Sequence, residues 1–223
     1  MSTVPPPVRP PAQGVGGSGG WGGGEHIRAL LEALKTVAVA LKEQSVPFAL
    51  AGGYAVYARG GPDSRHDVDF VITEEDAPRV LQGFTRRGLN VLEPPEDWLF
   101  KVDHGGVQVD LIYRLAHHPV DADLLERAEE LSVDSVHMPV LSATDLLQSK
   151  LWALGEHKCD LAPVLTIVRS LREQIDVDLV TRGSTGHAYA EAALFLARSL
   201  DLLPAASTDS GAVTRAQELG QDG

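Results

Sequence analysis

The sequence predicts an α/β (α+β) protein in which a small mixed sheet is flanked by helices and followed by a C-terminal helical subdomain. Up to residue 141, segments with helical spacing of apolar residues alternate with short apolar runs of strand length. From residue 142 to residue 204, only the helical spacing remains. The chain has 223 residues, 43% of them hydrophobic, which is enough for one core with a helical annex.

Both ends of the chain are expected to be disordered. Residues 1–24 are rich in proline and glycine and carry too few apolar side chains to offset the entropy of ordering. Residues 205–223 are predicted to form a second tail. Between the tails, residues 25–141 should form the core and residues 142–204 the helical subdomain.

The core is expected to begin with a helix over residues 25–44. Its apolar stripe consists of Ile27, Leu30, Leu31, Leu34, Val37 and Leu41. A strand at residues 48–51 then leads directly into Gly52-Gly53, and a short helix over residues 54–59 follows. The sequence Gly60-Gly61-Pro62-Asp63 ends that helix before a second strand at residues 67–72.

The rest of the core is expected to alternate in the same way. A helix near Val80 and Phe84 ends at Gly88. Further strands are predicted at residues 89–92, 98–102, 107–113, 132–136 and 138–141, with a hairpin turn at 103–106 and a polar helix at 123–130. Ser142 and Asp145 have near-capping-box spacing at the start of a helix, and two further helices are predicted over residues 159–175 and 187–200.

Gly52-Gly53 and the acidic strand that follows offer a phosphate cradle and a metal site. Adjacent glycines let the backbone approach a ligand closely, and the unpaired N–H groups of a helix start favour an anion. Asp67 and Asp69 should project from the same face of their strand, roughly 6.7 Å apart. Paired carboxylates of this kind suit one or two Mg²⁺ ions.

Asp110 is the candidate third carboxylate. In its strand, Val107, Val109 and Leu111 alternate with Gln108, Asp110 and Ile112. Asp110 therefore lies on the face opposite the valines and could meet Asp67 and Asp69 if the two strands are neighbours.

Composition excludes several classes of protein. The net charge is 19 − 31 = −12, which disfavours broad nucleic-acid coating but still allows a local pocket for a nucleotide or an RNA end. Cys159 is the only cysteine, so no internal disulfide can form. The sequence lacks a signal-peptide pattern and an apolar run of roughly 18 residues, so we expect a cytoplasmic protein without a membrane partner.

The motifs Gly52-Gly53, Asp67-Val68-Asp69 and Asp110 resemble those of the nucleotidyltransferase superfamily, whose fold is shared by DNA polymerase beta, aminoglycoside nucleotidyltransferases and abortive-infection type toxins. Many members carry Gly-Ser where this chain has Gly52-Gly53, so backbone N–H groups would supply that phosphate contact. The segment from Ser149-Lys150 to Asp160 is similar to the lysine-then-aspartate signature of the toxin-like members.

The resemblance implies an Mg²⁺-dependent enzyme that moves a nucleoside monophosphate from a nucleoside triphosphate, ATP among the candidates, to a hydroxyl acceptor. Asp67, Asp69 and Asp110 would hold two Mg²⁺ ions. Arg65 and Lys150 would neutralise triphosphate charge.

The acceptor stays open between an RNA or tRNA end, as for a toxin-like member with a cognate antitoxin, and a small molecule of the aminoglycoside type. The Lys150 and Asp160 signature favours the first, and the acidic net charge favours the second. A non-catalytic nucleotide-binding module and a metal-dependent phosphohydrolase are alternatives from other functional classes.

Overall fold

The computed structural model describes residues 23–64, 67–92 and 94–204. The expected tails therefore lie outside the described residues, except for residues 23 and 24 of the first tail. Gly23 and Gly24, expected in the N-terminal tail, instead form the first turn of helix α1 (Gly23–Glu43). No helix in the described part of the chain is both long enough and apolar enough to cross a membrane.

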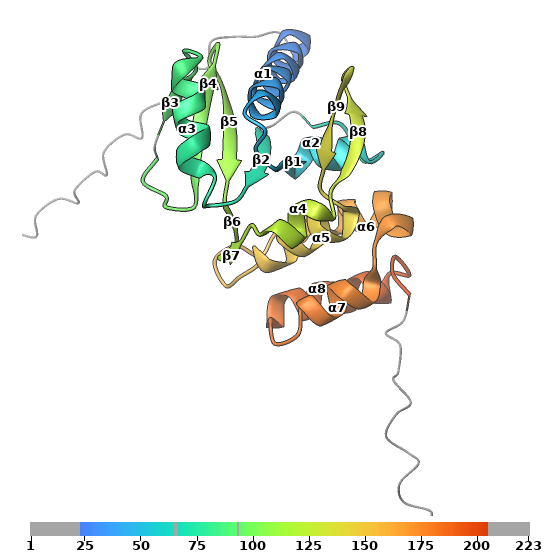
Figure 1. Cartoon of the computed structure of the whole chain (residues 1–223). Coiled ribbons are helices and arrows are strands. Elements are labelled where there is room, and N and C mark those ends of the chain that lie inside the picture. The colour runs from blue at the N-terminus through green and yellow to red at the C-terminus, as the bar shows by residue number, and fades with distance from the viewer. Residues whose placement is uncertain (1–22, 65–66, 93, 205–223) are drawn as a thin grey trace, which may run out of the picture.

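A seven-stranded mixed sheet forms the centre of the molecule, in the order β3-β4-β5-β2-β1-β9-β8 (Figure 1). β2 is parallel to β5 and β1 is parallel to β9, whereas the other neighbouring pairs are antiparallel. The strands are β1 (Phe48–Ala51), β2 (Val68–Ile72), β3 (Asn90–Leu92), β4 (Leu99–His104), β5 (Val107–Ile112), β8 (Glu129–Val133) and β9 (Val136–Val140). The predicted fold class is confirmed.

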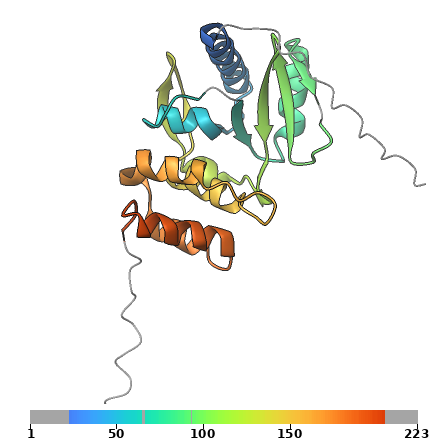
Figure 2. The same cartoon turned by 180° about the vertical axis from the view of Figure 1, so that it is seen from behind.

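Helices cover the sheet and extend beyond it. α1 packs on β5 and β2 and contacts α3, and α3 in turn packs on β3, while α2 lies against β1, β2 and α5. Figures 1 and 2 show α5 to α8 gathered at one end of the sheet. The remaining helices are α2 (Gly52–Ala58), α3 (Ala77–Arg86), α4 (Ala122–Glu126), α5 (Ala143–Trp152), α6 (Ala162–Leu171), the 3₁₀ helix η1 (Arg172–Gln174), α7 (Val177–Gly183) and α8 (Ala188–Ser199).

The core lies where α1 and α3 meet the sheet. Phe70 of β2 and Leu111 of β5 are fully buried together with Leu34 of α1 and Phe84 of α3. Burial of large side chains of this kind contributes roughly 1.5–3 kcal/mol each. The strands that carry the candidate carboxylates are therefore fixed by the apolar residues on either side of them.

Several predicted boundaries were wrong because strand pairing overrides local helical spacing. The polar helix expected over residues 123–130 ends at Glu126, since residues from Glu129 onward pair with β9. The turn between β8 and β9 lies at Asp134 and Ser135, both with positive φ, and not between residues 136 and 138.

Other differences concern the second half of the chain. The helix expected over residues 159–175 begins only at Ala162 and ends at Leu171. The small hairpin of β6 (Arg114–Leu115) and β7 (His118–Pro119) was not predicted, because two-residue strands have no readable alternation. Helix α7 was also missed, although the side chain of Asp176 caps it by accepting a hydrogen bond from the Leu179 N–H.

Candidate functional site

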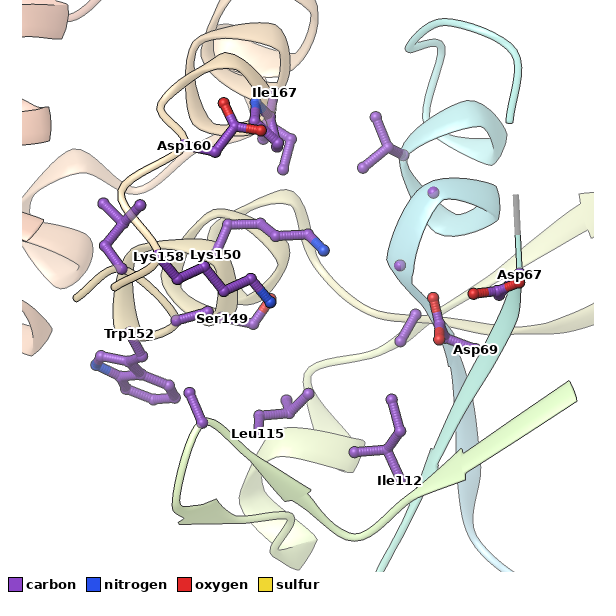
Figure 3. Close-up of a pocket in the computed structure, with 18 of the residues that line it drawn as sticks. Asp67, Asp69, Ile112, Leu115, Ser149, Lys150, Trp152, Lys158, Asp160 and Ile167 are labelled. Atoms are coloured by element: carbon purple, nitrogen blue, oxygen red, sulfur yellow. The ribbon is translucent and has the colours of Figure 1, made fainter. Parts of the chain in front are cut away.

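An open cavity of about 1300 Å³ lies between the sheet and the helical half of the chain. Gly52, Asp69 and Asp110 line it from the sheet side, and Lys150 lines it from α5. Figure 3 shows Asp67 and Asp69 on one side of the cavity and the side chains of Lys150 and Lys158 extending toward them from the other. The structure thus brings most of the predicted site residues to one cavity.

Asp69 and Asp110 lie directly opposite each other on neighbouring strands. β2 and β5 are parallel and adjacent, and their register pairs Asp69 with Asp110. Burial, as the larger cause, and the negative charge of Asp110 raise the pKa of Asp69, Lys150 opposes them, and the net result is a pKa of about 6. Two carboxylates so close together are stabilised by a shared cation.

Asp67 differs from the prediction because it precedes β2, which begins at Val68. Its residue is exposed, and Figure 3 shows its carboxylate beside that of Asp69. Among the residues that the structure describes, no three His, Cys, Asp or Glu side chains are arranged as a ready metal site. The hard oxygen donors of Asp67, Asp69 and Asp110 nevertheless match the chemistry of Mg²⁺.

Gly52 is required by the close approach of Asp69. It adopts φ +61°, a conformation that L side chains rarely take, at the start of α2. A Cβ atom at this position would lie 1.8 Å from Oδ2 of Asp69. Because Gly52 lacks a Cβ atom, the Asp69 carboxylate can lie directly against its Cα. The sequence did not reveal this function of the first glycine.

Gly53 lies against the side chain of Ser64. A Cβ atom on Gly53 would be 2.5 Å from the Ser64 Oγ, and Ser64 also lines the cavity. The Ser64 hydroxyl group therefore lies beside the second glycine, although position 53 itself is not a serine. Sequence reasoning missed Ser64 because it is separated from Gly53 by ten residues.

The predicted cations are only partly described by the structure. Lys150 is exposed on α5 and forms no ion pair with another described residue, which leaves its ammonium group available to an anionic ligand. Lys158, which had not been predicted as a site residue, lies on the following loop, where a backbone bridge joins it to Gly155. Arg65 lies outside the described residues.

Lys101 is the main residue that the sequence reading missed. Its Nζ lies 2.6 Å from Oδ1 of Asp110, and the register of β4 and β5 pairs the two residues. The hairpin turn predicted at residues 103–106 could have revealed the pairing of Lys101 with Asp110. A two-residue loop at Gly105 and Gly106 pairs His104 with Val107, and therefore Lys101 with Asp110.

Trp152 lines the cavity on its helical side, opposite Asp67 and Asp69 (Figure 3). The ring of Trp152 lies 3.7 Å from that of His118, which packs the β6–β7 hairpin onto α5. The indole N–H donates to the Gly183 carbonyl at 3.0 Å. Among the described residues, three lysine and arginine side chains line the cavity (Arg114, Lys150 and Lys158), together with three histidines, against seven acidic side chains (Asp63, Asp67, Asp69, Asp97, Asp110, Glu156 and Asp160).

Comparison with solved structures finds similar chains with low sequence identity. ANT(2'')-Ia, an antibiotic-resistance factor, is 18% identical, with 77% of this chain and 94% of that chain covered and a TM-score of 0.46. The lincosamide antibiotic adenylyltransferase LnuA is 14% identical, with 61% and 94% covered and a TM-score of 0.44. An antigenic nucleotidyltransferase-like protein from Paracoccidioides brasiliensis is 16% identical, with 78% and 90% covered and a TM-score of 0.49.

Comparison of the sequence with protein families gives a match over most of the chain. Among curated proteins, none matches this sequence. The profile of a family described as "Uncharacterised nucleotidyltransferase" matches residues 24–208, which include the whole cavity described above. The chain therefore belongs to this family of nucleotidyltransferases.

Proposed function

We propose that this protein transfers a nucleoside monophosphate from a nucleoside triphosphate to a hydroxyl acceptor and releases pyrophosphate. The observation that carries the proposal is the register pair of Asp69 and Asp110 in a cavity that the exposed ammonium group of Lys150 enters from the opposite side. Carboxylates that gather cations and an ammonium group that meets phosphate are the two requirements of phosphoryl transfer.

Asp67, Asp69 and Asp110 would hold Mg²⁺ in this proposal. Bound Mg²⁺ supplies neutralisation of the triphosphate charge and a lower pKa for the attacking hydroxyl. The protein contributes the position of Asp69, set by Gly52, and the position of Asp110, set by Lys101. Lys150 and Lys158 would contact the β- and γ-phosphates, and Arg65 is proposed to assist them.

The reaction is an in-line displacement at the α-phosphorus. The acceptor oxygen forms a new bond to phosphorus, while the bond to the bridging oxygen breaks and pyrophosphate leaves with that oxygen. Asp110 accepts the proton of the acceptor hydroxyl. Lys150 and Lys158 offset the charge that accumulates on the leaving group.

Two acceptors are proposed, and different observations support them. An RNA or tRNA end suits the resemblance of the Lys150 to Asp160 segment to toxin-like members, and a cognate antitoxin and a cytoplasmic location belong to the same proposal. A small cationic molecule suits the seven carboxylates of the cavity, because cations are attracted to an acidic surface. Trp152, on the helical side of the cavity, offers either acceptor a ring for stacking.

The test follows transfer of labelled nucleotide from each triphosphate with Mg²⁺, to total tRNA and to a set of aminoglycosides. Asp67→Ala, Asp69→Ala and Asp110→Ala should each reduce transfer by at least about 100-fold, because each removes a ligand of the cation. Asp178→Ala is the matched control, since it removes an exposed carboxylate of α7 outside the cavity and should leave transfer unchanged.

Each outcome of the assay has a separate meaning. Undiminished transfer by the Asp67 and Asp69 variants would refute the assignment of these residues. Nucleotide binding without turnover on any acceptor would indicate a binding module, and release of phosphate to water would indicate a phosphohydrolase.

A further inference from the structure

Lys101 forms an ion pair with Asp110, which lines the candidate site. The Nζ–Oδ1 distance is 2.6 Å, and the two side chains are only 26% and 12% exposed. Across three neighbouring strands, the register places Lys101, Asp110 and Asp69 in a row. Of the three candidate metal ligands, Asp110 is the one that has an ion-pair partner among the described residues.

The ion pair has two opposite effects on a divalent cation. Lys101 holds the Asp110 carboxylate in place and compensates for its burial, which would otherwise be costly. Its positive charge also reduces the attraction of both Asp110 and Asp69 for any second cation, since Lys101 acts electrostatically on Asp69 as well. A triphosphate carries several negative charges that would offset Lys101.

We propose that Lys101 is a positioning residue that lowers the divalent-cation affinity of the Asp69–Asp110 pair in the free protein, so that the ion binds firmly only together with the nucleotide. The inference rests on the proposed function for its nucleotide-dependent half. Because coupling between two ligands is reciprocal, removal of Lys101 should strengthen ion binding alone and weaken the mutual enhancement of ion and triphosphate.

The test measures Mn²⁺ binding to the full-length protein without nucleotide, by the electron paramagnetic resonance signal of the free ion. Lys101→Met should bind Mn²⁺ about tenfold more tightly than the wild type, since a nearby unit charge in a partly exposed site is removed. Lys101→Arg should behave as the wild type. With a non-hydrolysable triphosphate present, the Mn²⁺ affinities of the wild type and Lys101→Met should differ by a smaller factor than without it.

Lys35→Met is the matched control. Lys35 is 27% exposed and pairs with Glu32 and Asp134 at 2.7 and 3.1 Å, so its removal changes the net charge equally without touching the cavity. Its Mn²⁺ affinity should equal that of the wild type. Addition of Asp110→Asn to Lys101→Met should abolish the gain, which assigns the effect to Asp110.

Thermal unfolding gives a second reading. Lys101→Met leaves a buried carboxylate without its partner, so its melting temperature should be lower without metal and should rise more with Mn²⁺ than that of the wild type. Lys101→Gln, which keeps a hydrogen-bond donor but loses the charge, serves if the methionine variant does not fold.

Equal or weaker Mn²⁺ binding by the uncharged Lys101 variants would overturn the inference. These measurements need no turnover, so the two proposals fail separately. A missing nucleotidyl transfer together with the Lys101 effect refutes the proposed function alone, whereas intact transfer without that effect refutes only the inference about Lys101.

Discussion

At the scale of single residues, the neighbours of Asp69 determine how costly its negative charge is. Its negative charge is disfavoured by burial first and by Asp110 second, and it is partly compensated by Lys150 and Lys101. Gly52 gives it space by lacking a Cβ atom. Folding therefore places a charge where it is unfavourable in the absence of a bound cation.

Asp69→Asn should stabilise the metal-free protein at high pH. The pKa of Asp69 is about 6 in the folded protein and 3.8 in its unperturbed state, so the folded state binds more protons between these values. Stability contributed by this group is therefore lost as the pH rises from about 4 to about 6. At about pH 8 the variant should be more stable by about 3 kcal/mol, the equivalent of the pKa difference between 3.8 and about 6, and below about pH 4 the difference should vanish.

Urea denaturation with a chelator present measures this difference. Asp63→Asn, which removes an exposed carboxylate, controls for the loss of one negative charge. Equal stability of the Asp69→Asn variant and the wild type at about pH 8 would contradict the assigned cause.

At the scale of the elements, Arg59 joins the end of α2 to the end of β9. Its side chain is 3% exposed. The guanidinium donates to the carbonyls of Val140 and Leu141, and Gln174 of η1 donates to the Arg59 carbonyl at 3.0 Å. Because α5 begins directly after Leu141 and Ser142, these bonds fix the point where the helical half leaves the sheet.

Arg59→Met should lower the free energy of unfolding by about 2–4 kcal/mol, since buried carbonyls lose charged hydrogen-bond donors. Arg172→Met is the control because its side chain is 56% exposed and, among the residues that the structure describes, pairs only with the adjacent Glu173, so it should cost less than about 0.5 kcal/mol. Guanidinium denaturation provides the comparison. If Arg59→Met lowers the free energy of unfolding no more than the control does, the hydrogen bonds of Arg59 are not needed for stability.

At the scale of the whole molecule, the net charge and the charges lining the cavity bear on which acceptor is attracted to it. The net charge of −12 and the acidic lining both repel a polyanion and attract a cation. The proposed phosphate contacts are confined to Lys150 and Lys158 in one cavity. An RNA acceptor would have to insert its end against this field, whereas a small cationic acceptor would be drawn in.

Salt should therefore affect the KM values of the two proposed acceptors differently. When KCl is raised from about 50 to about 200 mM, the KM for a polycationic small acceptor should rise, because screening weakens attraction. The KM for a tRNA end should stay constant or fall, because screening weakens repulsion. Steady-state transfer assays at both salt concentrations measure this, and a steep rise of the KM for tRNA would reveal a basic RNA-binding surface instead.

The sequence by itself determined the fold class and the local elements of the site. The apolar spacing predicted the seven strands of the sheet, and the capping pair of Ser142 and Asp145 is confirmed, since the Ser142 side chain accepts from the Asp145 N–H. These features are local, because a cap, a turn or an alternating strand depends on residues within a few positions of one another.

Only the tertiary structure decided which residues share the cavity. Strand order places Asp110 beside Asp69 and Lys101 beside Asp110, and chain reversal brings Ser64 against Gly53. Strand pairing also places the β8–β9 turn at Asp134 and Ser135, earlier in the chain than predicted. The physical reason is that pairing between strands and packing of α5 on α2 depend on contacts between distant parts of the chain, which apolar spacing along one segment does not encode.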